Sequence, residues 1–141
     1  MRFMVIMYPG PAAETGALPE EKDLAEMGKF NEELVKAGVL LGGEGLHPSS
    51  KGARIRFPAG GKPTVSDGPF SEAKEIVGGF WMIQVKSKQE AIDWMKRCPA
   101  TRGEMIELRQ VFEAEDFAPS DPSGELRAAE QRLREQVAAK K

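Results

Sequence analysis

Two residues near the middle of the chain have the side chains best suited to acid–base chemistry. His47 is the only histidine among the 141 residues, and an unperturbed histidine is the side chain that titrates closest to neutral pH. Asp67 begins the stretch DGPF, and a carboxylate can orient a histidine ring while the ring accepts a proton. We predict His47 and Asp67 as candidate catalytic residues. The alternative for His47 is a surface position at the end of a strand.

The tripeptide Asp67-Gly68-Pro69 also has a purely structural interpretation. Aspartate side chains accept hydrogen bonds from backbone N–H groups that follow them in the chain, which closes a turn. Pro69 has no N–H, so we expect the N–H of Phe70 to donate to Asp67. Gly68 precedes a proline, which restricts it to extended or glycine-only conformations. The sequence favours this turn over catalysis and leaves both interpretations open.

Five further residues are candidates for contacting a ligand: Tyr8, Glu44, Phe70, Glu75 and Trp81. Glu44 interrupts the glycine-rich segment GGEG, so it either protects a sheet edge or lies in a cleft. Glu75 follows Glu72 and Lys74, and this charged stretch is either a solvated loop or the mouth of a cleft. The aromatic side chains either pack in the core or line a pocket, because ligand sites are mostly apolar with a few polar groups.

Three arginines on predicted strands, Arg54, Arg56 and Arg109, could hold an anionic ligand. Each alternates with apolar neighbours along its strand, and this pattern favours positions that face solvent.

Composition narrows the classes of partner. The chain has 20 basic and 22 acidic residues and a net charge of −2, which gives no electrostatic argument for binding nucleic acid or an anionic membrane. Cys98 is the only cysteine, so an intrachain disulfide is excluded, and one cysteine with one histidine cannot form a Cys/His zinc site. No apolar run reaches the ~18 residues of a spanning helix, and no signal peptide is evident. We expect a cytoplasmic protein without metal or cofactor.

Hydrophobic patterning indicates the elements that must position these residues. Apolar runs predict strands at residues 3–8, 39–46, 79–85 and 105–112, and alternation predicts a hairpin with strands at 53–57 and 64–66. Glycines in the 39–46 strand predict a bulge or a close approach of another backbone.

Two helices are expected between these strands. The first has Pro19 in its first turn, where proline is tolerated, and ends near Gly38, with an apolar stripe of Leu24, Met27, Phe30 and Leu34. The second begins at Ser87, where Ser87 and Glu90 match a capping box, and ends before Pro99. We divide the chain into a domain at 1–117 and, at 118–141, a linker and a charged C-terminal helix with a narrow stripe of Leu126, Ala129, Leu133 and Val137.

With the hairpin set aside, the order is β-α-β-β-α-β, which predicts an α+β protein with a ferredoxin-like antiparallel sheet. Both helices then cover one face of the sheet. The strands at 3–8 and 79–85 are apolar on both faces, so the second face must also be covered. A second copy is the simplest cover, because symmetric homodimers are the commonest oligomers. We therefore predict a homodimer that forms a dimeric α+β barrel.

Four segments together closely resemble the YCII-related family, in its DGPF branch. They are the first strand with Tyr8, AGVLLGGEGLHP at 37–48, DGPFSEAKEIVGGF at 67–80, and VFEAEDF at 111–117. The resemblance implies a ferredoxin-like dimer with a cleft beside the sheet, and it implies no known reaction. A His–Asp pair has been suggested as the active site of smaller relatives, but their histidine does not match the position of His47.

Two functions follow from the residues and the resemblance. The first is a dimeric protein that binds a small molecule in the cleft, with cofactor-free acid–base catalysis as its enzymatic form. The second is a non-catalytic regulatory or interaction module, because some DGPF proteins are encoded beside extracytoplasmic-function sigma factors. Heme or flavin use rests only on analogy with other dimeric α+β barrels.

Overall fold

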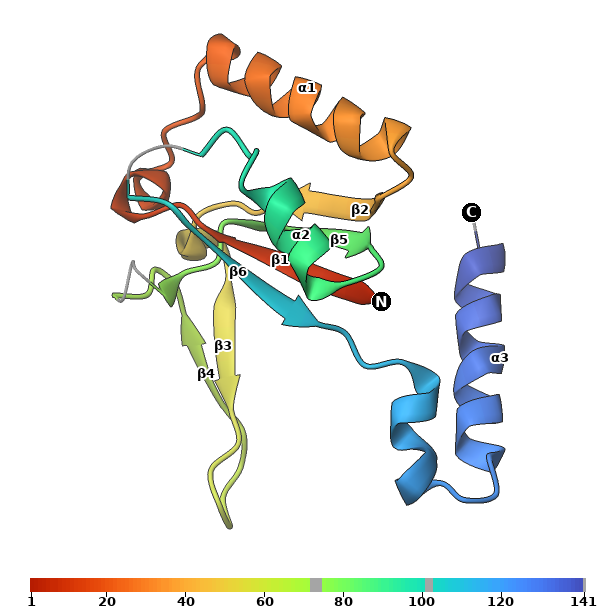
Figure 1. The fold of residues 1–141 in the computed structure, drawn as a ribbon. Coiled ribbons are helices and arrows are strands. Elements are labelled where there is room, and N and C mark those ends of the chain that lie inside the picture. The colour runs from red at the N-terminus through yellow and green to blue at the C-terminus, as the bar shows by residue number, and fades with distance from the viewer. Residues whose placement is uncertain (72–74, 101–102, 141) are drawn as a thin grey trace. The chain divides into compact units, whose positions relative to one another are not determined.

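The computed structural model describes residues 1–71, 75–100 and 103–140, so Glu72 and Lys74 lie outside the described residues. The chain divides into two compact units, Met1–Gln110 and Val111–Lys141 (Figure 1). The first unit holds a four-stranded sheet, a hairpin and two helices, and the second is helical. The predicted α+β class is confirmed.

The central sheet is antiparallel throughout, with strand order β2-β5-β1-β6. Its strands are β1 (Arg2–Tyr8), β2 (Leu40–Gly45), β5 (Gly79–Gln84) and β6 (Met105–Gln110). All four lie where apolar runs predicted them, although β6 ends before Phe112. Because β2 and β6 form the edges, the buried centre of the sheet is the pair of strands with continuous apolar runs, β1 and β5.

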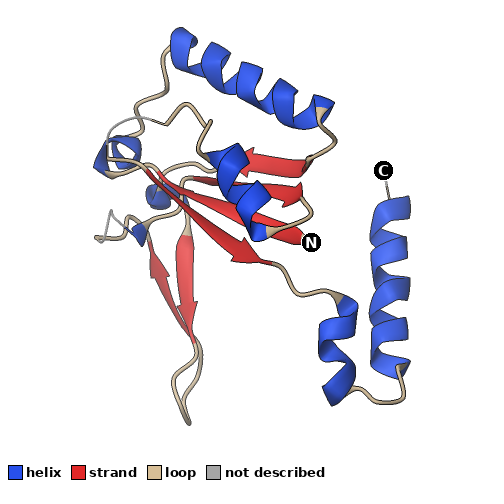
Figure 2. Cartoon of the chain, viewed as in Figure 1, coloured by secondary structure: helices blue, strands red, loops and turns tan. Residues whose placement is uncertain are grey.

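The predicted hairpin is confirmed as a separate two-stranded sheet of β3 (Ala53–Arg56) and β4 (Thr64–Asp67) (Figure 2). Its register pairs Ala53 with Asp67 and Arg56 with Thr64. Phe57, expected within the strand, lies beyond it and is exposed. Both ends of the hairpin lead into the loops that form the candidate site below.

The core lies between one face of the sheet and two helices, α1 (Glu21–Lys36) and α2 (Lys88–Met95). Register places Val5 opposite both Trp81 and Leu108, so these side chains share a face. The buried cluster on that face takes Phe30 and Leu34 from α1 and Ala91 and Met95 from α2. Leu24, which we expected in the helical stripe, is 59% exposed; the stripe is buried only towards the C-terminal half of α1.

Two sequence signals for helix ends appear in the structure, although the predicted capping box forms only in part. The Ser87 hydroxyl accepts a hydrogen bond from the Glu90 N–H at 3.1 Å, as a capping serine does. The Glu90 carboxylate accepts from the Lys86 N–H at 2.7 Å, one residue before the position that a regular capping box would use. Gly38 has a φ of 71° at the end of α1, a conformation that suits glycine.

Cys98 packs against the core, and burial, with a smaller contribution from Glu104, raises the pKa of its thiol to about 11.

The opposite face of the sheet is also apolar at its centre. Met4 lies opposite Met82, and Ile6 lies opposite Phe80. All four side chains are half-buried. The prediction that β1 and β5 are apolar on both faces is therefore confirmed.

Glycine in β2 allows a close approach to β5. The register shifts between Leu40 and Gly42, which is the predicted irregularity. A Cβ atom on Gly43 would lie 2.8 Å from the carbonyl oxygen of Phe80. A larger residue at Gly43 would therefore push the edge strand away from the sheet.

The second unit consists of a 3-10 helix at Ala114–Ser120 and α3 (Glu125–Ala139). Asp121 is buried between them, and its carboxylate accepts hydrogen bonds from the N–H groups of Leu126 at 3.2 Å and Arg127 at 2.9 Å. Asp121 thus satisfies free N–H groups in the first turn of α3, which its N-cap, Gly124, cannot do. None of the residues of α3 is buried. Along the described chain, no helix has both the length and the apolarity needed to cross a membrane.

Candidate functional site

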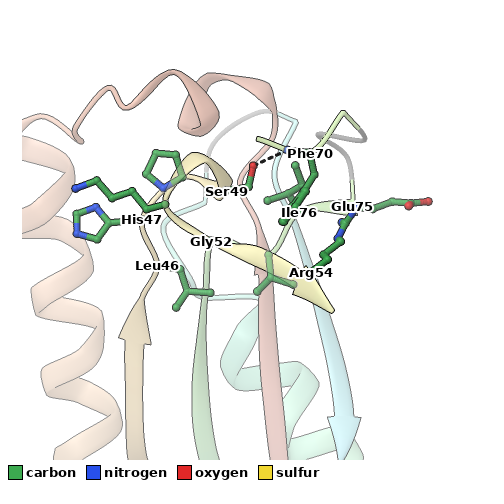
Figure 3. A pocket seen from close by; sticks show the side chains of 11 residues that line it. Leu46, His47, Ser49, Gly52, Arg54, Phe70, Glu75 and Ile76 are labelled. Carbon is green, nitrogen blue, oxygen red and sulfur yellow. Dashed lines mark hydrogen bonds between the residues drawn. The ribbon is translucent and has the colours of Figure 1, made fainter. Parts of the chain in front are cut away.

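An open pocket of about 390 Å³ lies between the segment that follows β2 and the loop that follows β4 (Figure 3). Three short stretches of chain and the start of β3 form its wall. The lining residues are Leu46, His47, Pro48, Ser49, Lys51, Gly52, Arg54, Phe70, Glu75, Ile76 and Val77. Its size is within the range of small-molecule sites.

Ser49 attaches the DGPF loop to the rest of the unit. The Phe70 N–H donates to Ser49 Oγ at 3.0 Å, drawn as a dashed line in Figure 3. Our expectation that Phe70 donates to Asp67 is therefore wrong. The preference for a local turn failed because a buried hydroxyl from a distant segment takes the same donor. The DGPF loop is thus bonded to Ser49 rather than closed on Asp67 by this hydrogen bond.

Glu14 completes this junction from the other side. Its carboxylate accepts hydrogen bonds from the Ser49 N–H at 2.9 Å and from the Ser49 hydroxyl. These two bonds, the hydroxyl bond being the stronger influence, lower the pKa of Glu14 below its usual value, because they favour the charged form. A chain of contacts from Glu14 through Ser49 to Phe70 thus fixes one wall of the pocket.

Gly68 lies in close contact with the same segment. Its N–H donates to the Gly52 carbonyl oxygen at 2.9 Å, and the Gly68–Pro69 peptide is cis. A Cβ atom at Gly68 would lie 1.7 Å from the Ser49 carbonyl oxygen, closer than any two such atoms can approach. Glycine is required by this contact, whereas the sequence suggested only the restriction imposed by proline.

Arg54 is the site residue that the sequence pattern placed in solvent. Its guanidinium lies 3.8 Å from the centre of the Phe70 ring and is half-buried. Such a contact is a cation–π interaction, and it holds the planar group in one orientation. Within the described part of the chain, no ion pair involves Arg54. Alternation along β3 correctly predicted that Arg54 points away from the main core. It did not predict that Arg54 faces Phe70, because that contact depends on how the loop after β4 folds.

The pocket brings together three of the seven predicted site residues: His47, Phe70 and Glu75. Figure 3 shows His47 on one side of the pocket and Glu75, beside Arg54, on the other. Asp67 lies in β4, is exposed and does not line the pocket. No hydrogen bond or ion pair joins His47 to Asp67, both of which are among the described residues.

The other three predicted residues lie elsewhere. Trp81 is in the core, where its indole N–H donates to Asn31 Oδ1 at 2.9 Å. The Tyr8 hydroxyl lies 3.5 Å from Glu107 Oε1, across β1 and β6. Glu44 is exposed on the edge strand β2 and does not line the pocket.

The charges around the pocket favour a negatively charged guest. Among the described residues that line the pocket, Lys51 and Arg54 are cationic and Glu75 is the only one with a carboxylate. His47 adds a further positive charge when it is protonated. Among the described residues, no group of three or more His, Cys, Asp or Glu side chains is arranged to hold a metal ion.

Comparison with known proteins places the chain in a family. The model of the YCII-related domain matches residues 1–132. An uncharacterized protein of Rhizobium meliloti (strain 1021) is 32% identical over 99 residues, which cover 68% of this chain and 78% of that protein. The family match extends from the sheet and the pocket into the second unit. The chain therefore belongs to the YCII-related domain family.

Proposed function

We propose that this protein binds a small organic anion in the pocket beside the DGPF loop. The observation that carries the proposal is the Arg54 guanidinium, which is stacked on Phe70 at the pocket wall without a carboxylate partner among the described residues. A planar guanidinium with free N–H groups recognises a carboxylate or phosphate through two parallel hydrogen bonds. Stacking limits its freedom before the ligand arrives, which lowers the entropic cost of binding.

The remaining lining indicates the rest of the ligand. Leu46, Ile76 and Phe70 present apolar side chains to the same space. A ligand that matches both parts has a carboxylate at one end and a short aliphatic or aromatic body at the other. Lys51 adds a second positive charge at the wall, which favours a ligand of charge −1 or −2.

Acid–base catalysis is the enzymatic form of this proposal. His47 is the lining residue whose imidazole ring can both accept and donate a proton. Glu75 is the nearest candidate for the opposite proton-transfer role, because it lines the pocket and Asp67 does not. The reaction requires a bound ligand between the two, since Figure 3 shows them on different sides of the pocket.

The branch of the family and the assembly complete the proposal. Placement in the DGPF branch rests on the sequence DGPF at 67–70, of which Phe70 lines the pocket. Strand order β2-β5-β1-β6 supports a ferredoxin-like topology. Half-buried Met4, Ile6, Phe80 and Met82 support a homodimer in which two such faces pack as a dimeric α+β barrel. Replacement of Ile6 by Glu would then disrupt this sheet contact and weaken association between copies in sedimentation experiments.

The test of ligand binding is a calorimetric titration with short aliphatic and aromatic mono- and dicarboxylates and their phosphate analogues. We expect at least one carboxylate to bind the wild type, with binding weakened at least about tenfold, or ~1.4 kcal/mol, by Arg54→Gln. Arg56→Gln is the matched control, because Arg56 is on the same strand, is exposed and does not line the pocket.

Two outcomes would contradict the proposal. One is that no compound binds the wild type at millimolar concentration, which would favour the regulatory or interaction module linked to sigma-factor signalling. The other is that Arg54→Gln and Arg56→Gln bind equally well. Arg54→Lys separates charge from shape, because lysine keeps the charge but lacks the planar fork.

The cytoplasmic location stays a prediction from the sequence.

A further inference from the structure

Helix α3 exposes an apolar stripe along its whole length. Leu126, Leu133 and Val137 are 69%, 56% and 73% exposed, and Ala129 lies on the same side between them. These residues recur at spacings of three or four positions, which places them on one face of a helix. The spacing is that of the seam between two paired helices.

The second unit gives this stripe no partner of its own. The 3-10 helix at Ala114–Ser120 lies beside α3 (Figure 1), yet none of the residues of α3 is buried. Phe112 and Phe117 stack on each other at 4.8 Å between ring centres, and both remain exposed. A helix of 15 residues is only marginally stable in water unless its apolar face is packed.

Charge along the second unit indicates what covers the stripe. Residues 111–125 contain five acidic residues and no lysine or arginine, and Arg127 in the first turn of α3 pairs with two of those acids, Glu115 and Asp121, whereas residues 131–140 contain three basic residues and one acidic residue. The unit therefore has a negative beginning and a positive end. Two copies placed side by side in opposite directions would bring the negative beginning of each to the positive end of the other. A parallel arrangement would bring like charges together.

We propose that α3 pairs in antiparallel orientation with α3 of a second copy of this chain. The stripe of Leu126, Ala129, Leu133 and Val137 forms the seam, and the opposite charges of the two ends set the direction. Opposed helix dipoles favour the same direction. This contact involves neither the pocket nor the sheet face, so it stands or fails independently of the proposed function.

Cross-linking of the full-length chain tests the direction of pairing. Two variants, Glu125→Cys and Lys140→Cys, are made in a Cys98→Ala background, so that each has one thiol at one end of α3. They are mixed, one labelled with heavy nitrogen, and treated with a short bismaleimide. In an antiparallel pair identical ends lie about 22 Å apart, because a helix rises ~1.5 Å per residue. In a parallel pair they lie about 10 Å apart.

We expect mixed 125–140 cross-links to predominate over products that join two identical positions. Leu133→Glu, introduced into both cysteine variants, should reduce the mixed product at least about tenfold, since it places two charges in the seam. Gln131→Glu is the matched control, because it adds the same charge to the opposite side of the same helix and should leave the yield unchanged. Circular dichroism verifies that each variant keeps its helix content.

Three results would overturn the proposal. Predominant cross-links between identical positions would show parallel pairing. Absence of cross-links between copies would show that the stripe is free or covered by its own chain. An equal yield with Leu133→Glu and Gln131→Glu would show that the stripe does not form the contact. Because the two cysteine variants leave the stripe intact, the first two results can be read even if Leu133→Glu does not fold.

Discussion

Different forces stabilise each of the two units of this chain internally. Met1–Gln110 buries a continuous apolar cluster between β1, β5, α1 and α2. In Val111–Lys141 the buried residue is an aspartate, and the apolar side chains of α3 stay exposed. Hydrophobic burial therefore determines the first unit, whereas hydrogen bonds at the start of a helix organise the second. Because none of its residues is buried, α3 gains little stability from apolar packing within its own unit.

The largest expected difference between the units comes from truncating one apolar residue in each. Ile83→Ala removes a fully buried side chain from the centre of the sheet and should lower the free energy of unfolding by about 2–5 kcal/mol. Leu133→Ala truncates an exposed side chain and should change it by less than about 0.5 kcal/mol in dilute solution. Urea unfolding followed by tryptophan fluorescence measures the effect of Ile83→Ala, because both tryptophans lie in the first unit, and unfolding followed by far-ultraviolet circular dichroism measures the effect of Leu133→Ala. Equal effects would mean that the comparison between the units is wrong.

A change in the first unit tests whether backbone contact matters there as much as side-chain burial. Gly68→Ala forces a Cβ atom against the Ser49 carbonyl oxygen, so we expect a loss of about 1–3 kcal/mol and weaker ligand binding. Gly45→Ala is the control, because a Cβ atom there meets nothing within 4 Å. The crucial measurement is thermal unfolding of both variants side by side. A Gly68→Ala protein as stable as the control would refute the close docking of the DGPF loop.

A change in the second unit should leave the first unaffected. Asp121→Ala removes the acceptor for the N–H groups of Leu126 and Arg127, so α3 should lose helix content in far-ultraviolet circular dichroism. Both tryptophans, Trp81 and Trp94, lie in the first unit, so tryptophan fluorescence should stay as in the wild type. Glu130→Ala provides the control for an acid removed from the exposed side of α3. A shift in tryptophan fluorescence with Asp121→Ala would show that the units are coupled.

The smallest expected effect is a pH dependence at the junction of Glu14 and Ser49. The folded protein lowers the pKa of Glu14, so its contribution to stability is present above the pKa of the unfolded chain. That contribution is lost as the pH falls through the lowered folded value. The difference in unfolding free energy between wild type and Glu14→Gln should therefore shrink as the pH falls from about 7 to 3. Glu21→Gln should show no such trend, and a difference that grows towards low pH would reverse our assignment.

The elements of the first unit were predicted well because buried apolar side chains recur along the sequence with the period of the helix or strand that they belong to. Apolar runs located β1 and β5, alternation located the β3–β4 hairpin, and glycines located the irregularity in β2. Each of these signals is local, with a period set by the geometry of one element. The exposure of Leu24 was missed because a helical stripe shows which side faces the core and does not show how far the sheet extends along it.

The site was predicted only in part because its contacts join distant segments. His47, Phe70 and Glu75 were recognised from residue type and do line the pocket. The bonds of Ser49 to Glu14 and Phe70 connect residues 35 and 21 positions apart, and no local pattern encodes them. For Trp81 the sequence left core packing and ligand contact open, because aromatic residues serve both; its register opposite Val5 places it in the core. No pattern in the sequence marked Ser49 as a site residue, and its one notable local feature is that it follows Pro48.

The β3–β4 hairpin makes the pocket observable from a distance. Among the described strands, β3 and β4 pair only with each other. At their open end, where Ala53 pairs with Asp67, the pocket lining includes Gly52 and Arg54 at the start of β3 and Phe70 just after β4. A ligand that holds Arg54 against Phe70 therefore restrains both strands at once. We expect slower amide hydrogen exchange at paired residues such as Ile55 and Val65, which do not line the pocket. Exchange rates along the hairpin would thus report occupancy of the pocket by any compound, whatever its chemical identity.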